Sequence, residues 1–395
     1  MERIYLDYAA TSPLDARVLE EMMPYLTEVY GNASSQHRFG QVAQMAIDKA
    51  RERVAKAIGA KPNEIYFTSG GTESDNWAIK GIAEARKSKG RHIISTPIEH
   101  HAVLHTLDWL KSHGFEITYV PVDSVGKVKL DELEKAIRPD TILITVMAAN
   151  NEVGTIQPIA EIGKIAREHG VLFHTDAVQA VGSIPINVKD MQIDLLSMSA
   201  HKFYGPKGIG ALYIRNGLKV DKLVVGGAQE RTMRGGTYNT AAIVGMGKAI
   251  ELATENLDEY AKKISEVRNY FVNKVLNEIP EVIFNGAPFE DRLPNNANFA
   301  FKYIEGEGIL MTLDMAGIAV SSGSACSSGS LQSSHVLLAM GLEEVFAHGS
   351  IRFTFGRSTT KENVDYVVEI LKGAVNRLRA MSPLFNQLKG DVTDV

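Results

Sequence analysis

The sequence predicts an α/β fold with a largely parallel sheet and a smaller second domain, and two observations lead to this expectation. From about residue 60 to 215, short β-rich runs alternate with amphipathic helical stretches. After about residue 247, a long charged helical stretch leads into mixed helical and strand segments. Strands separated by helices long enough for a crossover are typical of a parallel sheet covered on both faces. The later segments predict a smaller α+β domain.

The strands of the predicted sheet are short runs rich in β-branched and aromatic residues. They are expected at residues 64–68, 92–95, 117–122, 142–147, 171–174 and 195–198. The helices between them are expected at residues 72–89, 101–113 and 159–169, and one long helix is expected at 249–279. Ligands of such sheets bind at the carboxyl ends of the strands. Functional side chains are therefore expected just after these runs.

The length and composition predict the number of domains, the kinds of partner and the compartment. Because 395 residues exceed one simple core, we expect a large domain at 15–250 and a small domain formed by 1–14 and 251–395. A net charge of −5 predicts no nucleic-acid partner. The apolar runs are too short to cross a membrane, and the first residues lack the features of a secretory signal. We therefore expect a cytoplasmic protein without a membrane partner.

A turn with two glycines, Ser69-Gly70-Gly71-Thr72-Glu73-Ser74, lies between a predicted strand and a predicted helix. Glycines let the backbone approach an anion, and the free N–H groups at a helix start favour negative charge. An ordinary helix entry capped by Thr72 has the same sequence pattern. Since neither a Walker loop nor a G-x-G-x-x-G turn after a strand is present, ATP and nicotinamide cofactors are not expected.

Asp176 and Lys202 follow two later strands of the predicted sheet. A carboxylate at such a place can pair with a protonated ring nitrogen and make the ring an electron sink, although a helix N-cap is the alternative. A lysine there can form a Schiff base, whereas most lysines are solvated. The glycine turn, Asp176 and Lys202 occur in this order at successive strand ends. Together they supply the three contacts that pyridoxal phosphate needs, at its phosphate, ring nitrogen and aldehyde carbon.

Cys326 is the only cysteine, which excludes an internal disulfide and a multi-cysteine zinc site. An isolated cysteine is usually a buried hydrophobic residue. Cys326, however, lies in a serine- and glycine-rich run, 321–330, with no apolar side chain larger than alanine. Such a run is typical of a flexible loop, so we expect an exposed thiol that acts as a nucleophile.

Three other positions suit a ligand site, each with an ordinary structural alternative. His100 follows a strand and can stack on a cofactor ring, or serve as a loop residue. Asn151 also follows a strand and can bind a ligand or form a turn. Arg352 alternates with apolar residues, so it favours a carboxylate ligand or a structural ion pair. His101 and His105 share a helical face, but without H-E-x-x-H no metal site is expected.

Taken together, these residues resemble the cysteine desulfurases, a branch of the fold-type-I pyridoxal-phosphate enzymes in the class-V aminotransferase family. The resemblance runs from residue 5 to residue 384. Its most specific parts are Thr72-Glu73-Ser74-Asp75-Asn76, Ala200-His201-Lys202 and the run around Cys326. The long cysteine loop resembles the group that serves iron–sulfur cluster assembly and nitrogen fixation.

The resemblance implies a role for each residue and a homodimer. Lys202 is implied as the Schiff-base lysine, Asp176 as the partner of the ring nitrogen and Cys326 as the sulfur acceptor. His100 is implied to stack on the ring and to act in catalysis. The remaining implied cofactor ligands are Gly71, Thr72, Asn151, Gln179, Ser199, His201 and Thr237. Thr237 would reach in from a second subunit, and Asn151 with Arg352 would bind the substrate carboxylate.

The implied reaction converts L-cysteine to L-alanine and leaves a persulfide on Cys326 for an acceptor protein such as an iron–sulfur scaffold. Lys202 would move the Cα proton, and the thiolate of Cys326 would attack the substrate sulfur. The alternatives within enzymes are a selenocysteine lyase or an aminotransferase acting on a small amino acid. A non-catalytic sulfur carrier or a phosphate-binding module is a different class, against which Lys202 argues.

Overall fold

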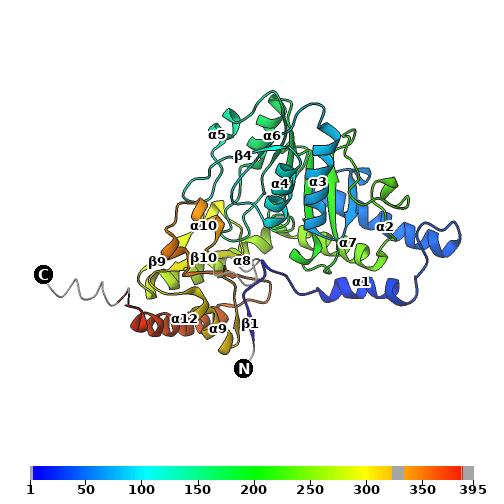
Figure 1. Cartoon of the computed structure of the whole chain (residues 1–395). Coiled ribbons are helices and arrows are strands. Elements are labelled where there is room, and N and C mark those ends of the chain that lie inside the picture. Colours follow the sequence, from blue (N-terminus) through cyan, green and yellow to red (C-terminus); the bar gives the residue numbers. More distant parts are fainter. Residues whose placement is uncertain (1–2, 323–332, 384, 386–395) are drawn as a thin grey trace.

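The structure is a computed structural model that describes residues 3–322, 333–383 and 385. Figure 1 shows a larger part, in which helices enclose a central sheet, and a smaller part beside it that carries most of the C-terminal third of the chain. Three sheets are present in the described ranges, with seven, three and two strands. No helix there has the length and apolar character that crossing a bilayer requires.

The larger sheet has the strand order β2-β8-β7-β6-β5-β3-β4. Four neighbouring pairs are parallel, and only β8 runs antiparallel to both of its neighbours. The fold class predicted from the alternating pattern is therefore confirmed. The strands are β2 (Ile65–Thr68), β3 (His92–Ser95), β4 (Glu116–Tyr119), β5 (Thr141–Thr145), β6 (Leu172–Asp176), β7 (Leu195–Ser199) and β8 (Gly210–Ile214).

The strand β8 is absent from the predicted series, and its first residue shows why. Gly210 is a weak strand former, yet a Cβ atom at this position would lie 2.7 Å from the Cα atom of Gly70. The glycine is needed because the turn after β2 packs directly on β8. Gly210 is thus required by the packing of the glycine turn, but its low β-propensity weakens the sequence signal for β8.

Helices cover both faces of this sheet, as the sequence predicts. One face carries an apolar core that includes Val18, Ile47, Phe173 and Ile250, and the other carries a core around Trp77 and Leu107. The helices of this part are α1 (Ala16–Thr27), α2 (Arg38–Ala57), α3 (Gly71–Arg86), α4 (His101–Ser112), α5 (Leu130–Lys135), α6 (Ile159–Glu168) and α7 (Thr240–Glu255).

The smaller part packs helices on the antiparallel sheet β12-β10-β9, with a core rich in phenylalanine. Its strands are β9 (Val282–Asn285), β10 (Asn296–Phe301) and β12 (Ser350–Thr354), and β1 (Ile4–Tyr5) pairs in parallel with β11 (Ile318–Ala319). Its helices are α8 (Leu257–Glu278), α9 (Gly306–Met315), α10 (His335–Ala339), α11 (Glu344–Ala347) and α12 (Lys361–Met381). Short 3-10 turns occur at Pro62–Glu64, Ala200–Lys202, Glu230–Thr232 and Phe289–Asp291.

The prediction of one long helix over residues 249–279 is wrong. The chain leaves the helical conformation at Asn256, with φ −133° and ψ 46°, so α7 ends and α8 begins there. Ala249 and Ile250 belong to the core of the larger sheet, whereas Ile264 and Phe271 belong to the core of the smaller one. Because the helix breaks at Asn256, α7 packs on the core of the larger sheet and α8 packs on the core of the smaller sheet. The domain boundaries at residues 15 and 250 stay predictions.

Candidate active site

One cavity at the carboxyl ends of the parallel strands brings together most of the predicted site residues. Its volume is about 200 Å³. The predicted residues that line it are Gly71, Thr72, His100, Asn151, Asp176, Gln179, Ser199, His201 and Lys202. Asp75, Met147, Ala149 and Val178 also line it, although the sequence analysis gave them no role.

The glycine turn forms one end of this cavity. Helix α3 begins at Gly71, and the residue before it provides no side-chain cap for the free N–H groups. A Cβ atom on Gly71 would lie 2.7 Å from Cγ2 of Val178, so only glycine fits here without displacing that side chain. Ser199 and His201 face the same cavity. A helix N-terminus with a hydroxyl and an imidazole beside it suits a phosphate group.

Asp176 ends β6, is buried and lines the cavity. The backbone N–H of Val178 donates a hydrogen bond of 2.9 Å to its Oδ1. Burial raises the pKa of Asp176 to about 6, while that hydrogen bond and the charge of Lys202 oppose the rise. A cationic N–H group opposite this carboxylate would stabilise its charged form. The arrangement therefore fits a protonated pyridine ring.

Asp75 is a second buried carboxyl group in the lining of the same cavity. Burial and the neighbouring Asp176 raise its pKa well above the ordinary value. Its Oδ1 lies 3.6 Å from Nε2 of His174, whose pKa burial lowers to about 3. His174 instead contacts the hydroxyls of Thr145 and Ser197, at 2.8 and 3.0 Å. His174 is therefore neutral near pH 7. The sequence signal for Asp75 was its place one helical turn after Gly71, on the same face of α3.

Lys202 points from its 3-10 turn toward the beginning of the chain. Its Nζ donates to the carbonyl oxygens of Ala9 and Ala10, the latter at 2.9 Å. Nε2 of Gln179 donates to the same Ala9 oxygen at 3.0 Å, and Nδ1 of His201 contacts the Thr11 hydroxyl at 3.1 Å. Residues 7–12, named here the N-terminal segment, thus form one wall of the lysine site.

The two cavity histidines are neutral near pH 7. Burial lowers the pKa of His100 to about 4, and the charge of Lys202 contributes. Burial likewise lowers the pKa of His201 to about 4, with contributions from Lys202 and Lys207. Nδ1 of His100 accepts a hydrogen bond from the backbone N–H of Ala102 at 3.1 Å. The proton of His100 therefore lies on Nε2.

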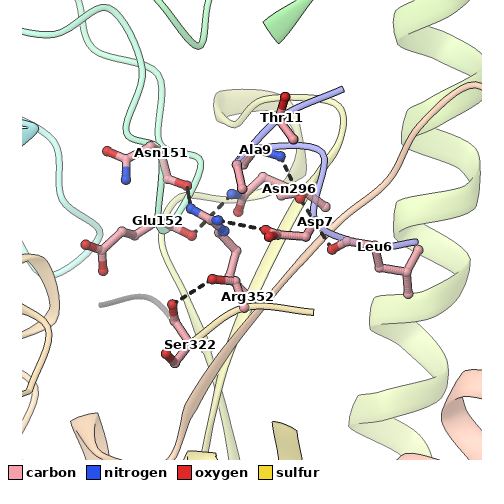
Figure 2. A network of polar contacts seen from close by, with 12 residues as sticks. Leu6, Asp7, Ala9, Thr11, Asn151, Glu152, Asn296, Ser322 and Arg352 are labelled. Carbon is pink, nitrogen blue, oxygen red and sulfur yellow. Dashed lines mark hydrogen bonds and ion pairs between the residues drawn. The ribbon is translucent and has the colours of Figure 1, made fainter. Parts of the chain in front are cut away.

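Arg352 lies next to Asn151 (Figure 2). Its Nη1 donates to the carbonyl oxygen of Asn151 at 2.9 Å, and its Nη2 forms an ion pair with Oδ1 of Asp7, also at 2.9 Å. Asn151 itself lines the cavity. The guanidinium thus contacts a residue of the cavity lining. Asp7 was not among the predicted site residues.

Thr237 and Cys326 are the predicted residues still to be accounted for. Thr237 lines a different cavity of the same chain, with Thr68, Ser69 and Arg234, so its service to a second subunit stays a prediction. Cys326 lies outside the described residues. On the two sides of the undescribed segment, Ser321 exchanges backbone hydrogen bonds with Arg352, and the Ser334 hydroxyl donates to Glu152.

Known proteins with similar sequences point to one family. Residues 4–367 match the family described as aminotransferase class-V. The chain is 56% identical over 386 residues to a cysteine desulfurase IscS from Dictyoglomus turgidum, with 98% of each chain covered. It is 49% identical over 392 residues to a cysteine desulfurase from Pongo abelii, covering 98% of this chain and 85% of that protein.

Solved structures agree with this result. A NifS-like protein is 43% identical and superposes with a TM-score of 0.90, covering 95% of this chain and 100% of that one. A structure described as SspA in complex with cysteine is 40% identical, with a TM-score of 0.80 and coverage of 89% and 98%. The resemblance drawn from the motifs is confirmed.

Proposed function

The chain belongs to the cysteine desulfurases of the class-V aminotransferase family, and we propose on this premise that it converts L-cysteine to L-alanine and takes the sulfur onto Cys326. The observation that carries the proposal is the single cavity in which Lys202, Asp176, His100 and the start of α3 meet. A sulfur carrier or a phosphate-binding module needs no lysine in such a setting.

The residues present fit pyridoxal phosphate. The N-terminus of α3, with Ser199 and His201, would hold the phosphate, and Asp176 would pair with the ring nitrogen. His100 would stack on the ring, and Gln179 would contact the ring oxygen. Bound through Lys202, pyridoxal phosphate supplies an electron-withdrawing ring that stabilises negative charge at the substrate Cα.

Different side chains of this protein bind the substrate, move its proton and accept its sulfur. Asn151 and Arg352 orient the substrate carboxylate, and the amine of Lys202 takes and returns the Cα proton. His100 is neutral and carries its proton on Nε2, so it has a proton to give on the side away from Ala102. The thiolate of Cys326 attacks the substrate sulfur, so an S–S bond forms as the substrate C–S bond breaks. L-Cysteine and the Cys326 thiol thereby become L-alanine and a Cys326 persulfide.

We further propose a cytoplasmic homodimer that passes the persulfide sulfur to an acceptor protein for iron–sulfur cluster assembly. The position of Thr237 outside its own chain's Lys202 cavity supports a dimer in which Thr237 serves the partner. The names of the similar proteins support the sulfur-transfer role. Sedimentation of the loaded protein and sulfur transfer to a purified scaffold protein test these two points.

The decisive experiment combines cofactor loading with product analysis. The parent protein should bind pyridoxal phosphate covalently, form L-alanine from L-cysteine and gain 32 Da on Cys326, the mass of one sulfur atom, to about one unit. Lys202→Ala should lose the visible absorbance of covalently bound cofactor, whereas Cys326→Ala should keep it and lose the persulfide. A keto acid as the main product would favour an aminotransferase, and turnover of selenocysteine alone would favour a selenocysteine lyase. A protein that binds no cofactor would overturn the proposal.

A further inference from the structure

Arg352 is a cation enclosed by the protein, with 5% of its surface exposed. A buried guanidinium needs an anionic partner close by. Among the described residues, Asp7 is the only acid in ion-pair contact with it, at 2.9 Å. Glu152 is nearby, but burial raises its pKa to about 7, and its Oε2 accepts a hydrogen bond from Ser334. The charge of Arg352 is therefore balanced by Asp7.

The backbone around Asp7 is held on the strand that carries Arg352. Asp7 forms a parallel bridge with Thr354, two residues beyond Arg352 in β12. The N–H of Thr354 donates to the Leu6 carbonyl at 2.8 Å, and the N–H of Ala9 donates to the Thr354 hydroxyl at 2.9 Å (Figure 2). Asp7 thus presents its carboxylate to Arg352 from a fixed backbone rather than from a mobile surface loop.

Asp7 leaves the guanidinium with donors for a ligand. Of its five N–H donors, one points to Asp7 and one to the Asn151 carbonyl. Its Nε is buried and has no hydrogen-bond partner within the described part of the chain. The second N–H groups of Nη1 and Nη2 also have no partner in the described part of the chain, and these are the donors that a second carboxylate can use while Asp7 stays in place.

The N-terminal segment that holds Arg352 also holds the lysine. Three residues after Asp7, the carbonyl of Ala10 accepts a hydrogen bond from Nζ of Lys202, and the Ala9 carbonyl accepts another. The segment therefore spans the distance between the group expected to bind the substrate carboxylate and the group expected to receive its amine. Both groups must be fixed relative to one another for Cα to be held at the reacting position.

We propose that Asp7 is a positioning residue for substrate recognition, which fixes the guanidinium of Arg352 where it receives the carboxylate of the amino-acid substrate. The inference rests on the proposed function for the identity of the substrate and deepens it by adding a residue that acts through Arg352. The alternative is that Asp7 competes with the substrate for Arg352. The two interpretations predict opposite effects when Asp7 is replaced.

The test compares ligands with and without a carboxylate on the enzyme loaded with pyridoxal phosphate. L-Alanine and ethylamine differ only in this group, and each is titrated by the change in cofactor absorbance. Asp7→Asn should weaken L-alanine binding about tenfold and raise KM for L-cysteine by a similar factor, with kcat changed less than about threefold. Asp7→Ala should show a larger effect in the same direction. Ethylamine binding should stay within about twofold of the parent.

A matched control exists in the same part of the chain. Asp15 pairs with Arg357 at 2.9 Å, and Asn retains the N-cap function that Asp15 has at α1. Asp15→Asn should therefore leave L-alanine binding unchanged. In addition, the double variant Asp7→Ala with Arg352→Ala should bind L-alanine no more weakly than Arg352→Ala alone, because Asp7 acts only through Arg352.

Three results would overturn the proposal: tighter L-alanine binding by Asp7→Asn, equal loss for L-alanine and ethylamine, or additive losses in the double variant. Thermal unfolding of each variant separates a positioning effect from a loss of folded protein. If the loaded parent releases no sulfur from L-cysteine, the proposed function fails, yet the L-alanine titration still decides the role of Asp7, since it needs only bound cofactor.

Discussion

The two ends of the active site are built in different ways. At the cofactor end, Asp176, Ser199 and Lys202 follow neighbouring strands of one parallel sheet, so the topology alone brings them together. At the substrate end, Asp7, Asn151 and Arg352 come from three distant segments of the chain (Figure 2). The first end depends on the order of strands, and the second depends on how the smaller part packs against the larger one.

The comparison predicts the largest effect at the cofactor end. Asp176→Asn keeps the size of the side chain but removes the charge that would hold a proton on the ring nitrogen. We expect kcat to fall by roughly 10²–10³-fold, in the range of removing one preorganised electrostatic contact. Bound cofactor should remain visible by absorbance. A kcat within tenfold of the parent would show that the ring nitrogen has no need of Asp176.

At the substrate end, Arg352→Ala should act mainly on KM. Removing one partner of a buried charge pair costs about 2–5 kcal/mol, which corresponds to roughly 30-fold or more in KM for L-cysteine. The change in kcat should be smaller, and covalent loading with pyridoxal phosphate should be normal. Steady-state kinetics together with the absorbance of the loaded variant provide the measurement. A loss of kcat with unchanged KM would contradict the division between the two ends.

The different construction of the two ends also explains which site residues can be predicted from the sequence. Strand-end residues such as Asp176 and Lys202 are predictable because a parallel sheet collects residues at regular intervals of the chain. Asn151 and Arg352 were weaker predictions, because a turn and a structural ion pair explain their sequence patterns equally well until the resemblance to a family is added. Asp7 had no local signal, since its role depends on a bridge to Thr354 nearly 350 residues away. Asp75 had a signal in its helical spacing, but the rise of its pKa follows from burial and from the neighbouring Asp176, which the sequence does not reveal.

A smaller effect is expected from Gly71→Ala at the phosphate end. The new methyl group would lie 2.7 Å from Cγ2 of Val178, which must move into the cavity or push the turn away. We expect the affinity for pyridoxal phosphate to fall about tenfold, the size of a modest overpacking cost of 1–3 kcal/mol. The double variant with Val178→Ala should recover most of this loss, as measured by equilibrium dialysis of the cofactor. Failure of the second change to help would mean that the backbone of Gly71, and not the space beside it, matters.

The smallest effects concern the pH dependence of the stability of the cofactor-free protein, where the two ends should differ in sign. His100 stays neutral in the folded state down to about pH 4, whereas the unfolded chain binds its proton below about pH 6.5. Between these values the unfolded state binds more protons, so the contribution of His100 lowers stability as the pH falls. Glu152 at the substrate end stays protonated in the folded state up to about pH 7, whereas it ionises near pH 4.5 when unfolded. Its contribution therefore lowers stability as the pH rises through this window.

Urea unfolding at pH 5, 6, 7 and 8 can separate the two contributions. Relative to the parent, His100→Gln should gain stability from pH 7 to pH 5, and Glu152→Gln should gain stability from pH 5 to pH 7, each by at most about 1.4 kcal/mol per pH unit. The stability of each variant relative to the parent should change with pH in opposite directions. Changes in the same direction would contradict the expected difference between the two ends, because one of the two groups would then be solvated in the folded protein and titrate much as it does in the unfolded chain.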